Sequence, residues 1–297
     1  MRLAGVCPSA MAAVGHVRVW HVTDPVSWFE AVVLGLVQGL TEFLPISSSA
    51  HVLIVSQLFG WKDPGAAFTA VTQIGTELAV LVYFRIDIAR IITVWFHSLR
   101  DISLRRELDA RMGWYIIVGT IPISVLGVAF SSQIETAARN LWLVAVMLIV
   151  FGVVLGVADA LGSRRHDLTE LNARDGLLFG LGQALALIPG VSRSGATIST
   201  GLALGYTRES SARYAFLLAV PAVLASGFYE MTKISGDGGA SWGPTILATI
   251  IAFFVGIAVI AWLLRWITTK TFLPFVLYRI LLGFAVIMLL WVGLLTS

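Results

Sequence analysis

Two short polar stretches interrupt a chain that is otherwise mostly apolar. The first is QGLTEFLPISSSAH, residues 38–51, and the second is IPGVSRSGA, residues 188–196. They carry a carboxylate, amide and hydroxyl groups, an imidazole and a guanidinium, and each stretch contains a proline that can end a helix. Side chains of these kinds bind anions, transfer protons and act as hydroxyl nucleophiles.

The spacing within the first stretch places its polar side chains in one small volume. Gln38 and Glu42 are four residues apart, so they share a helix face before the break at Pro45. Serines follow where the next helix should begin, a position that serine favours. His51 lies within the first turn of that helix, where it can face their hydroxyls. The serines are Ser47, Ser48 and Ser49.

The second stretch adds Ser192, Arg193, Ser194 and Thr197 between and after two glycines. An arginine inside a membrane is costly unless it is paired with an anion. Its planar fork suits a phosphate or a carboxylate in two-point contact. A helix that starts after the break would also direct its free N–H groups at an anion. The two stretches together therefore predict one anion site.

Each of these groups also has a structural explanation. The serines can cap a helix, His51 can be a hydrogen-bonded core residue, and Arg193 can pair with Glu42 as a structural bridge. We favour a shared ligand because at least six polar groups lie in two breaks. Two further charges receive structural assignments. Glu77 could reach the site from the span 66–84, but we favour a bond to the backbone of a neighbouring helix. Arg279 is expected to extend to the cytoplasmic surface.

The composition is that of a membrane protein. The chain has 297 residues, 58% hydrophobic and 12% charged, with a mean hydropathy of +0.88. Soluble domains are nearer half apolar and a quarter charged. The net charge of +3 is small and the basic residues form no single run, so nucleic acid is not expected as a partner. The single cysteine, Cys7, excludes an intramolecular disulfide and a cysteine-based metal site.

Six apolar segments are long enough to span a bilayer, which takes about 20 residues. Segments 28–59 and 176–204 contain the polar stretches and are interrupted halfway. Non-helical backbone at that depth must be buried in protein or line a wet cavity, so we interpret both as re-entrant helix–loop–helix hairpins. The predicted fold is an all-α polytopic membrane protein, with one membrane domain, 27–297, after a loosely ordered extension, 1–26. The predicted spans are 66–84, 114–130, 141–160, 214–231, 244–264 and 272–295.

The basic residues support this topology. If both hairpins return to their starting side, thirteen of the 20 Lys and Arg lie on one side of the membrane and five on the other. The remaining two, Arg193 and Arg279, lie inside apolar segments. The positive-inside rule makes the richer side cytoplasmic and places both termini outside.

The two hairpins also form an internal repeat. A shift of 145 residues aligns 35–50 with 180–195 without a gap. Because the hairpins enter from opposite sides, the halves 27–160 and 161–297 are predicted to have inverted topology, with their broken helices close together near the midplane. The aligned identities include Gln38 with Gln183, Ser47 with Ser192 and Ser49 with Ser194.

QGLTEFLPISSSAH together with PGVSRSGATIS closely resembles the two signature motifs of bacterial undecaprenyl-diphosphate phosphatases, the integral-membrane bacitracin-resistance type. The resemblance extends over almost the whole chain from about Trp28 and includes QIGTELAVLVYF and FLPFVLYR. It implies an enzyme of the bacterial inner membrane that hydrolyses undecaprenyl diphosphate to the monophosphate and inorganic phosphate, which recycles the carrier for cell-wall glycan synthesis. It also implies a divalent cation, Mg²⁺ or Ca²⁺, and a site that opens towards the outer face.

The family's catalytic positions fall on Glu42, Ser48, His51 and Arg193 of this sequence. Glu42 would also hold the cation together with Gln38. Many members have glutamate at this second position, so the site here has one negative charge fewer. The candidates for substrate binding are Gln38, Ser47, Ser49, Ser192, Ser194 and Thr197.

Ser48 is the favoured nucleophile, with His51 as its base or as the proton donor to the leaving oxygen. Attack by His51 or by an activated water is left open. The expected partners are the polyprenyl diphosphate and membrane lipids, and a homodimer is left open. The rival function is a transporter or flippase of a phosphorylated polyprenyl lipid, because inverted repeats with broken helices are typical of secondary transporters.

Overall fold

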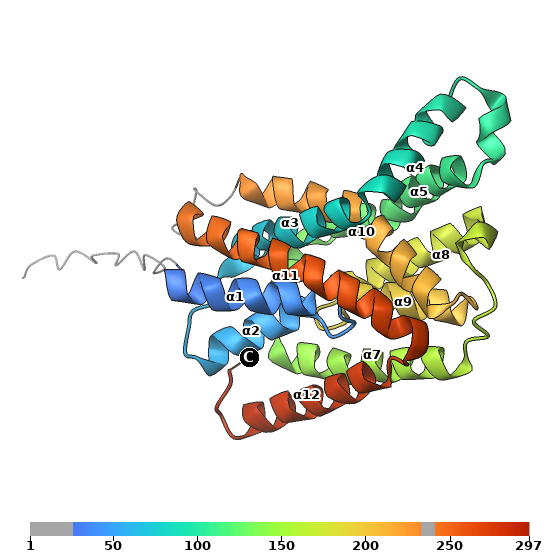
Figure 1. The fold of residues 1–297 in the computed structure, drawn as a ribbon. Coiled ribbons are helices and arrows are strands. Elements are labelled where there is room, and N and C mark those ends of the chain that lie inside the picture. The colour runs from blue at the N-terminus through green and yellow to red at the C-terminus, as the bar shows by residue number, and fades with distance from the viewer. Residues whose placement is uncertain (1–25, 233–240, 297) are drawn as a thin grey trace, which may run out of the picture.

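The computed structural model describes residues 26–232 and 241–296, and in these ranges its regular elements are helices (Figure 1). The predicted N-terminal extension, 1–26, lies outside the described residues except for its last residue. One isolated bridge joins His166 to Tyr206. The prediction of an all-α protein is therefore confirmed.

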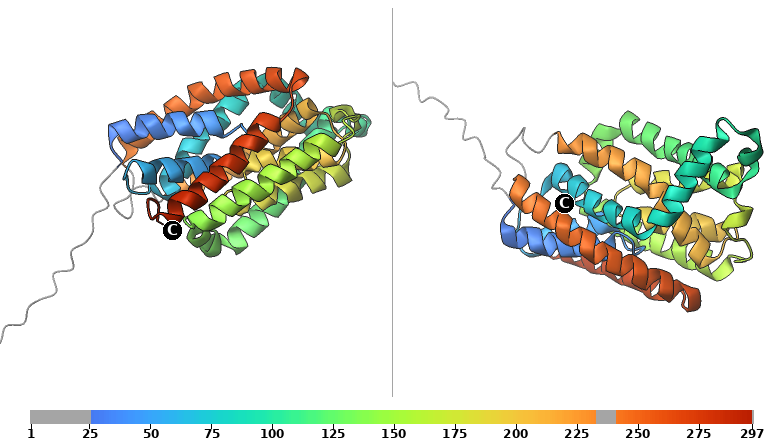
Figure 2. Two further views of the ribbon diagram at one scale, coloured as in Figure 1. Left: turned by 90° about the horizontal axis from the view of Figure 1, so that it is seen from below. Right: turned by 45° about the horizontal axis from the view of Figure 1, so that its top comes forward.

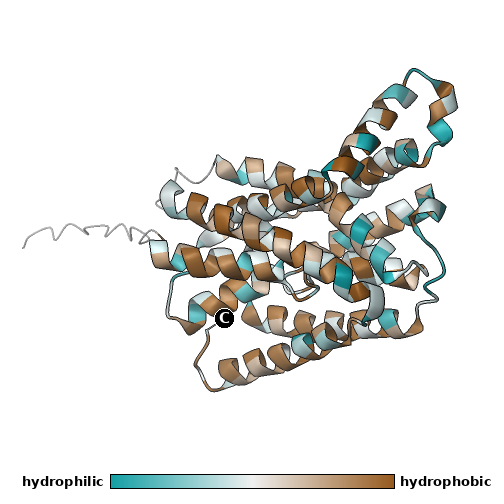
Figure 3. Cartoon of the chain, viewed as in Figure 1, coloured by the Kyte–Doolittle hydropathy of each residue, from teal (hydrophilic) through white to brown (hydrophobic). Residues whose placement is uncertain are grey.

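Six helices are long and apolar enough to cross a membrane, and each overlaps one predicted span. Several extend further than predicted, because polar residues continue a helix beyond its apolar centre. Apolar residues cover most of the helices, and hydrophilic residues gather in the loops at the end of the bundle that carries α8 (Figure 3). The protein is thus a multi-pass membrane protein. The six are α3 (Gly65–Tyr83), α5 (Leu108–Ala129), α7 (Leu141–Leu161), α10 (Arg208–Met231), α11 (Trp242–Thr269) and α12 (Leu273–Trp291).

The two interrupted segments each form a pair of shorter helices. The first gives α1 (Trp28–Thr41) and α2 (Ser48–Leu58), which contact each other. The second gives α8 (Ala173–Ala184), a single 3₁₀ turn η3 (Leu185–Leu187), and α9 (Arg193–Ala203). Figure 1 places α1 and α2 at one end of the bundle and α8 and α9 at the other. The polar stretches lie in the two breaks.

One long element and three short ones were not predicted. Helix α4 (Arg85–Ser98) follows α3 at an angle and projects from the bundle beside α5, and η1 (Ile102–Arg106) comes after it (Figure 1). Helix α4 is too short for a span and carries charges in its first turns, so its apolar positions gave no span signal. The remaining short elements are α6 (Ser131–Ala137) and η2 (Leu168–Glu170).

Helix α11 holds α1 and α3 close together through glycine contacts. A Cβ atom on Gly35 would lie 2.7 Å from the carbonyl oxygen of Ala248, and one on Gly75 would lie 2.2 Å from that of Thr249. Only glycine permits this approach of backbones, which is a common packing mode in membranes. On the other side of the molecule α12 packs along α7 (Figure 2). These contacts fix the helices that carry the site.

Candidate active site

The two breaks meet inside the bundle. Ser194, in the first turn of α9, donates from its hydroxyl to the carbonyl oxygen of Leu44 at 3.1 Å and to that of Glu42 at 3.3 Å. Both acceptors belong to the first break, about 150 residues earlier in the chain. The structure therefore brings the two polar stretches into direct contact, as the sequence predicts.

A buried cluster of charges and hydroxyls forms where they meet. Arg193 donates through Nη2 to Oε1 of Glu42 at 2.7 Å and to Oε1 of Glu77 at 2.8 Å. The other oxygen of Glu42, Oε2, accepts from Oγ of Ser48 at 2.6 Å and from Nε2 of Gln38 at 2.5 Å. The carboxylates of Glu42 and Glu77 are 5% and 0% exposed, so each depends on these partners for its charge. The hydroxyl proton of Ser48 points at a carboxylate.

The favoured interpretation of Glu77 was wrong, and the alternative, in which Glu77 reaches the site from its span, is confirmed. Its side chain pairs with Arg193 instead of bonding the backbone of a neighbouring helix. A carboxylate without a partner would be very costly in this interior, and Arg193 is the cation within reach. The sequence held a signal for this pair, because an acid in the middle of α3 and an arginine in a break are opposite charges at similar depth.

His51 does not bond the hydroxyl of Ser48. Its Nδ1 lies 2.7 Å from the carbonyl oxygen of Ser47, which can only accept, so Nδ1 carries the proton. Its Nε2 lies 2.7 Å from the hydroxyl of Tyr278 on α12, and in the neutral ring this nitrogen accepts. The hydroxyl of Ser48, which was predicted to face His51, donates to Glu42 instead. Sequence reasoning missed Tyr278, since no spacing rule joins α2 to α12.

Both helices that leave the breaks begin with a serine in a left-handed backbone conformation. The φ angle is 74° at Ser47 and 71° at Ser192, values uncommon outside glycine. No side chain caps the first turn of α2, so its leading N–H groups are free to bind a ligand. In α9 the hydroxyl of Ser192 accepts from the N–H of Gly195 at 3.2 Å. The positive ends of α2 and α9 lie at the two breaks.

The remaining candidates for substrate binding differ in whether their hydroxyl groups are accessible to a ligand. The hydroxyls of Ser47 and Ser49 lie 3.4 Å apart, and Ser49 is exposed. The equivalent pair in the second break, Ser192 and Ser194, lies 3.2 Å apart and is buried. Thr197 is fully buried and donates to the carbonyl of its own helix one turn earlier, so its hydroxyl has no free role towards a ligand.

The buried Arg279 was predicted to extend to the surface, and that prediction was wrong. The residue is 0% exposed, and within the described part of the chain its guanidinium donates to backbone carbonyls. Three of the acceptors, Pro45, Gly190 and Val191, belong to the breaks, where carbonyls lack helical partners. The distances are 3.0 Å from Nη1 to Pro45 and 2.9 Å from Nη2 to Gly190. The distance from Nη2 to Val191 is 3.0 Å, and the remaining acceptors are Met147 and Leu148 on α7.

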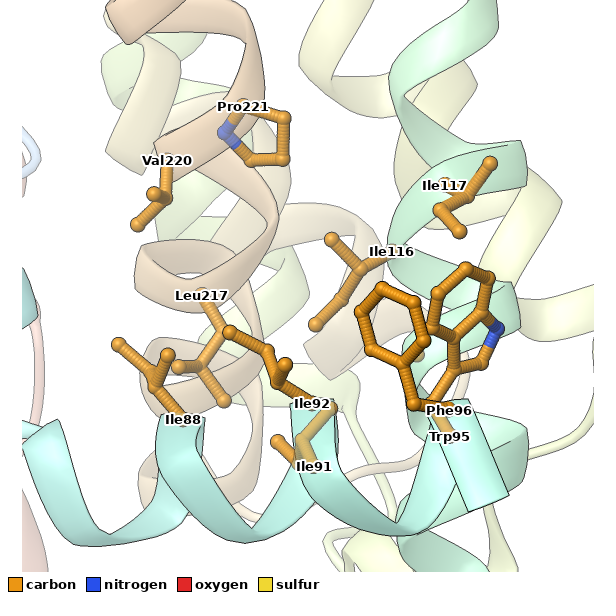
Figure 4. A pocket seen from close by; sticks show the side chains of 11 residues that line it. Ile88, Ile91, Ile92, Trp95, Phe96, Ile116, Ile117, Leu217, Val220 and Pro221 are labelled. Atoms are coloured by element: carbon orange, nitrogen blue, oxygen red, sulfur yellow. The ribbon is translucent and has the colours of Figure 1, made fainter. Parts of the chain in front are cut away.

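Two cavities flank α10 on different faces. A small one reaches the charged cluster, and α10 contributes Phe216 and Ala219 to its wall. A larger one of about 300 Å³ lies between α4, α5 and α10, where Leu217 and Val220 line it (Figure 4). Its wall is almost wholly apolar, with Ile92 from α4 among the contributors. The larger cavity has the character of a hydrocarbon site and is separate from the charged cluster.

Oxygen atoms without partners remain in the cluster. Oε1 of Gln38 and Oε2 of Glu77 are buried and accept no hydrogen bond. Mg²⁺ and Ca²⁺ prefer such oxygen ligands, and Mg²⁺ is often held by one or two carboxylates plus phosphate oxygens. The described residues contain no group of three acidic, histidine or cysteine side chains around one point. The donors present thus fit a cation that a phosphorylated ligand helps to hold.

Fold and site together define a polytopic membrane protein with a buried polar site. A hydroxyl that donates to a carboxylate, a guanidinium and two helix N-termini meet there, and this combination suits an anionic ligand. A sequence model described as "Bacitracin resistance protein BacA" matches residues 31–285. The chain therefore belongs to the BacA family.

Similar proteins are named as undecaprenyl-diphosphatases. "Undecaprenyl-diphosphatase 2" of Streptomyces avermitilis is 60% identical over 279 residues, covering 90% of this chain and 96% of that protein. "Undecaprenyl-diphosphatase" of Streptomyces griseus is 62% identical over 282 residues, covering 91% and 97%. "Undecaprenyl-diphosphatase" of Thermobifida fusca is 58% identical over 270 residues, covering 91% and 92%.

Proposed function

We propose that this protein hydrolyses undecaprenyl diphosphate to undecaprenyl phosphate and inorganic phosphate. The observation that carries the proposal is the hydroxyl of Ser48, 2.6 Å from a carboxylate oxygen of Glu42, whose other oxygen binds Arg193. A nucleophile, a base and a phosphate-binding guanidinium thus share one buried site. The names of the similar proteins support the same substrate.

In the first step Ser48 attacks the terminal phosphorus while Glu42 takes its proton. The bond from Oγ to phosphorus forms, and the bridging P–O bond breaks. Undecaprenyl phosphate leaves, and the proton on Glu42 passes to it. In the second step Glu42 takes a proton from water, which attacks the phosphoserine, and the proton returns to the serine oxygen as inorganic phosphate is released.

Glu42 replaces His51 as the base in this mechanism. Both ring nitrogens of His51 are engaged, one with the carbonyl of Ser47 and one with Tyr278. The imidazole therefore holds the left-handed turn at Ser47, which directs the start of α2 at the ligand. His51 acts through this geometry and need not exchange a proton with Ser48.

Charge on the transferred group is balanced by the protein. Phosphoryl transfer depends mainly on positioning and on neutralising the phosphate oxygens. Arg193, the leading N–H groups of α2 and the positive end of α9 supply this neutralisation. A divalent cation, Mg²⁺ or Ca²⁺, would add positive charge when bound. Gln38 and Glu77, through their unpartnered oxygens, would hold it together with the diphosphate, in place of the predicted pair Gln38 and Glu42, because both oxygens of Glu42 are engaged.

The hairpins α1–α2 and α8–α9 are proposed to be re-entrant and related by an inverted repeat of halves 27–160 and 161–297. Each helix of the hairpins is too short to cross a bilayer alone. The left-handed serines, Ser47 and Ser192, occupy equivalent repeat positions. The basic loops then face the cytoplasm, both termini lie outside, and the site opens to the outer face of the bacterial inner membrane. Association into a homodimer stays a prediction.

The experiment is phosphate release from undecaprenyl diphosphate by purified protein in detergent. Ser48→Ala should abolish most of the release seen for the wild type. Ser56→Ala on the same helix is the control, because its hydroxyl is buried and makes no hydrogen bond. Wild-type protein that releases no phosphate but moves the lipid in vesicles would identify a transporter instead, and wild-type-like release by Ser48→Ala would remove serine as the nucleophile.

A further inference from the structure

Arg279 joins the two breaks through a single guanidinium. Its Nη1 bonds the carbonyl of Pro45 in the first break, and its Nη2 bonds those of Gly190 and Val191 in the second. Pro45 and Gly190 are equivalent under the shift of 145 residues that relates the repeats. Helix α12, which belongs to neither hairpin, thus binds both at corresponding points.

These carbonyls lie directly before the parts of the breaks that turn towards the ligand. Each equivalent carbonyl precedes by two residues a left-handed serine, Ser47 or Ser192, at the start of α2 or α9. A residue that fixes both carbonyls also fixes the separation and the direction of the two helix N-termini. The N-termini can bind one diphosphate together only if that separation is maintained.

The charge of Arg279 is not neutralised by an acid. Among the residues that the structure describes, its bonds go to carbonyls, and the ion pairs of the site involve Arg193 instead. A buried cation that only dipoles solvate creates a positive potential around it. It lies directly behind α9, since a Cβ on Gly195 would be 2.9 Å from its Nη1. An anion at the N-termini would supply the missing charge.

We propose that Arg279 is a positioning residue of the site: it clamps the two breaks so that both helix N-termini face one diphosphate, and its charge strengthens the binding of that anion. The inference rests on the proposed function for its substrate. If Arg279 were purely structural, its substitution would change only the stability of the protein. If it is a clamp, substitutions should also change turnover and anion affinity, and these two effects can be separated.

Two substitutions separate the clamp from the charge. Arg279→Lys keeps the charge, but one ammonium cannot bond both breaks as the planar fork does. It should bind inorganic pyrophosphate nearly as tightly as the wild type while kcat falls about 100-fold, the loss expected from a misplacement near 1 Å. Arg279→Met should lose turnover to the same extent and also weaken pyrophosphate binding about tenfold, the loss of one charge-assisted interaction.

Calorimetric binding of pyrophosphate and steady-state phosphate release are measured on detergent-purified protein, together with thermal stability. Arg208→Lys is the control, because Arg208 is also largely buried but pairs with Asp159 at the start of α10. It should lose stability without a change in either constant. Arg279 variants that bind pyrophosphate and turn over like Arg208→Lys would overturn the proposal.

Gly195→Ala tests the same clamp without removing the arginine, and it answers the question even if the Arg279 variants do not fold. The new methyl group would lie 2.9 Å from Nη1 of Arg279, the nitrogen that bonds Pro45, and should push it from that carbonyl; it would also lie 3.2 Å from Ser192. We expect kcat to fall about tenfold or more, while Gly127→Ala, whose methyl group meets only Leu187 at 3.7 Å, leaves kcat unchanged. Equal behaviour of these two variants would refute the clamp. Wild-type protein without phosphatase activity would instead refute the proposed function, and pyrophosphate binding would still test the role of Arg279.

Discussion

Replacing Glu42 by glutamine removes the acceptor of the Ser48 proton with almost no change in shape. An amide oxygen can still accept a hydrogen bond from Ser48, but it cannot take the proton at neutral pH. Arg193 keeps its second partner, Glu77, at 2.8 Å. The cluster of two carboxylates and one guanidinium becomes a single balanced ion pair. We therefore expect the variant to fold and to keep its affinity for the substrate.

The expected loss follows from the role of Glu42 in the reaction. General-base catalysis contributes about 10²–10⁴-fold to a rate, and each factor of ten corresponds to about 1.4 kcal/mol of activation free energy. The barrier for Glu42→Gln should thus rise by about 3–5 kcal/mol. This loss should lower kcat and leave KM nearly unchanged. The amide still accepts the hydrogen bond from Ser48 in the ground state, and the difference from the carboxylate arises only when the proton is transferred.

The assay is steady-state phosphate release in detergent, with kcat and KM determined separately and folding checked by thermal denaturation. His51→Gln is the matched comparison, since it removes the other candidate base. In the present mechanism it disturbs only the turn at Ser47 and costs less than Glu42→Gln. If Glu42→Gln retains the wild-type order of magnitude in kcat while His51→Gln does not, the assignment of the base is wrong.

Three further predictions concern the guanidinium, the packing and the cation. Arg193→Lys should fold but lose about 100-fold or more in kcat/KM, because a point charge cannot replace the fork; wild-type activity would reduce the arginine to a structural bridge. Gly75→Ala should destabilise the protein by about 1–3 kcal/mol, since its Cβ would lie 2.2 Å from the backbone of Thr249, and a thermal shift equal to that of Gly127→Ala would contradict this packing. Chelation should lower phosphate release, and added Mg²⁺ or Ca²⁺ should restore it; activity that resists a chelator would exclude the cation.

The spans and the breaks could be predicted from the sequence because both leave local signals. A run of apolar residues as long as α7 is most stable as a helix that spans the membrane. A proline beside several serines indicates that a helix is interrupted there. The pairing of Arg193 with Glu42 was also among the alternatives, because buried charges need partners. These features depend on composition and spacing within one segment.

The parts that could not be predicted depend on which helix faces which. Arg279 and Tyr278 are adjacent on α12, and their roles follow only from the packing of α12 against α7 and the two breaks. An arginine near the end of a membrane span usually extends to the surface. Arg279 instead bonds carbonyls in the two breaks that have no helical partner. Helix α4 was missed for another reason, since its apolar positions are interleaved with charges over a short length.

The sharing of Arg193 between Glu42 and Glu77 has a consequence for the end of the catalytic cycle. A phosphate that binds Nη2 of the guanidinium must compete with two resident carboxylates, which already occupy that nitrogen. The site therefore favours an anion with further contacts, such as a diphosphate anchored by its lipid, over free inorganic phosphate. Inorganic phosphate, the product of the reaction, should thus inhibit turnover only weakly.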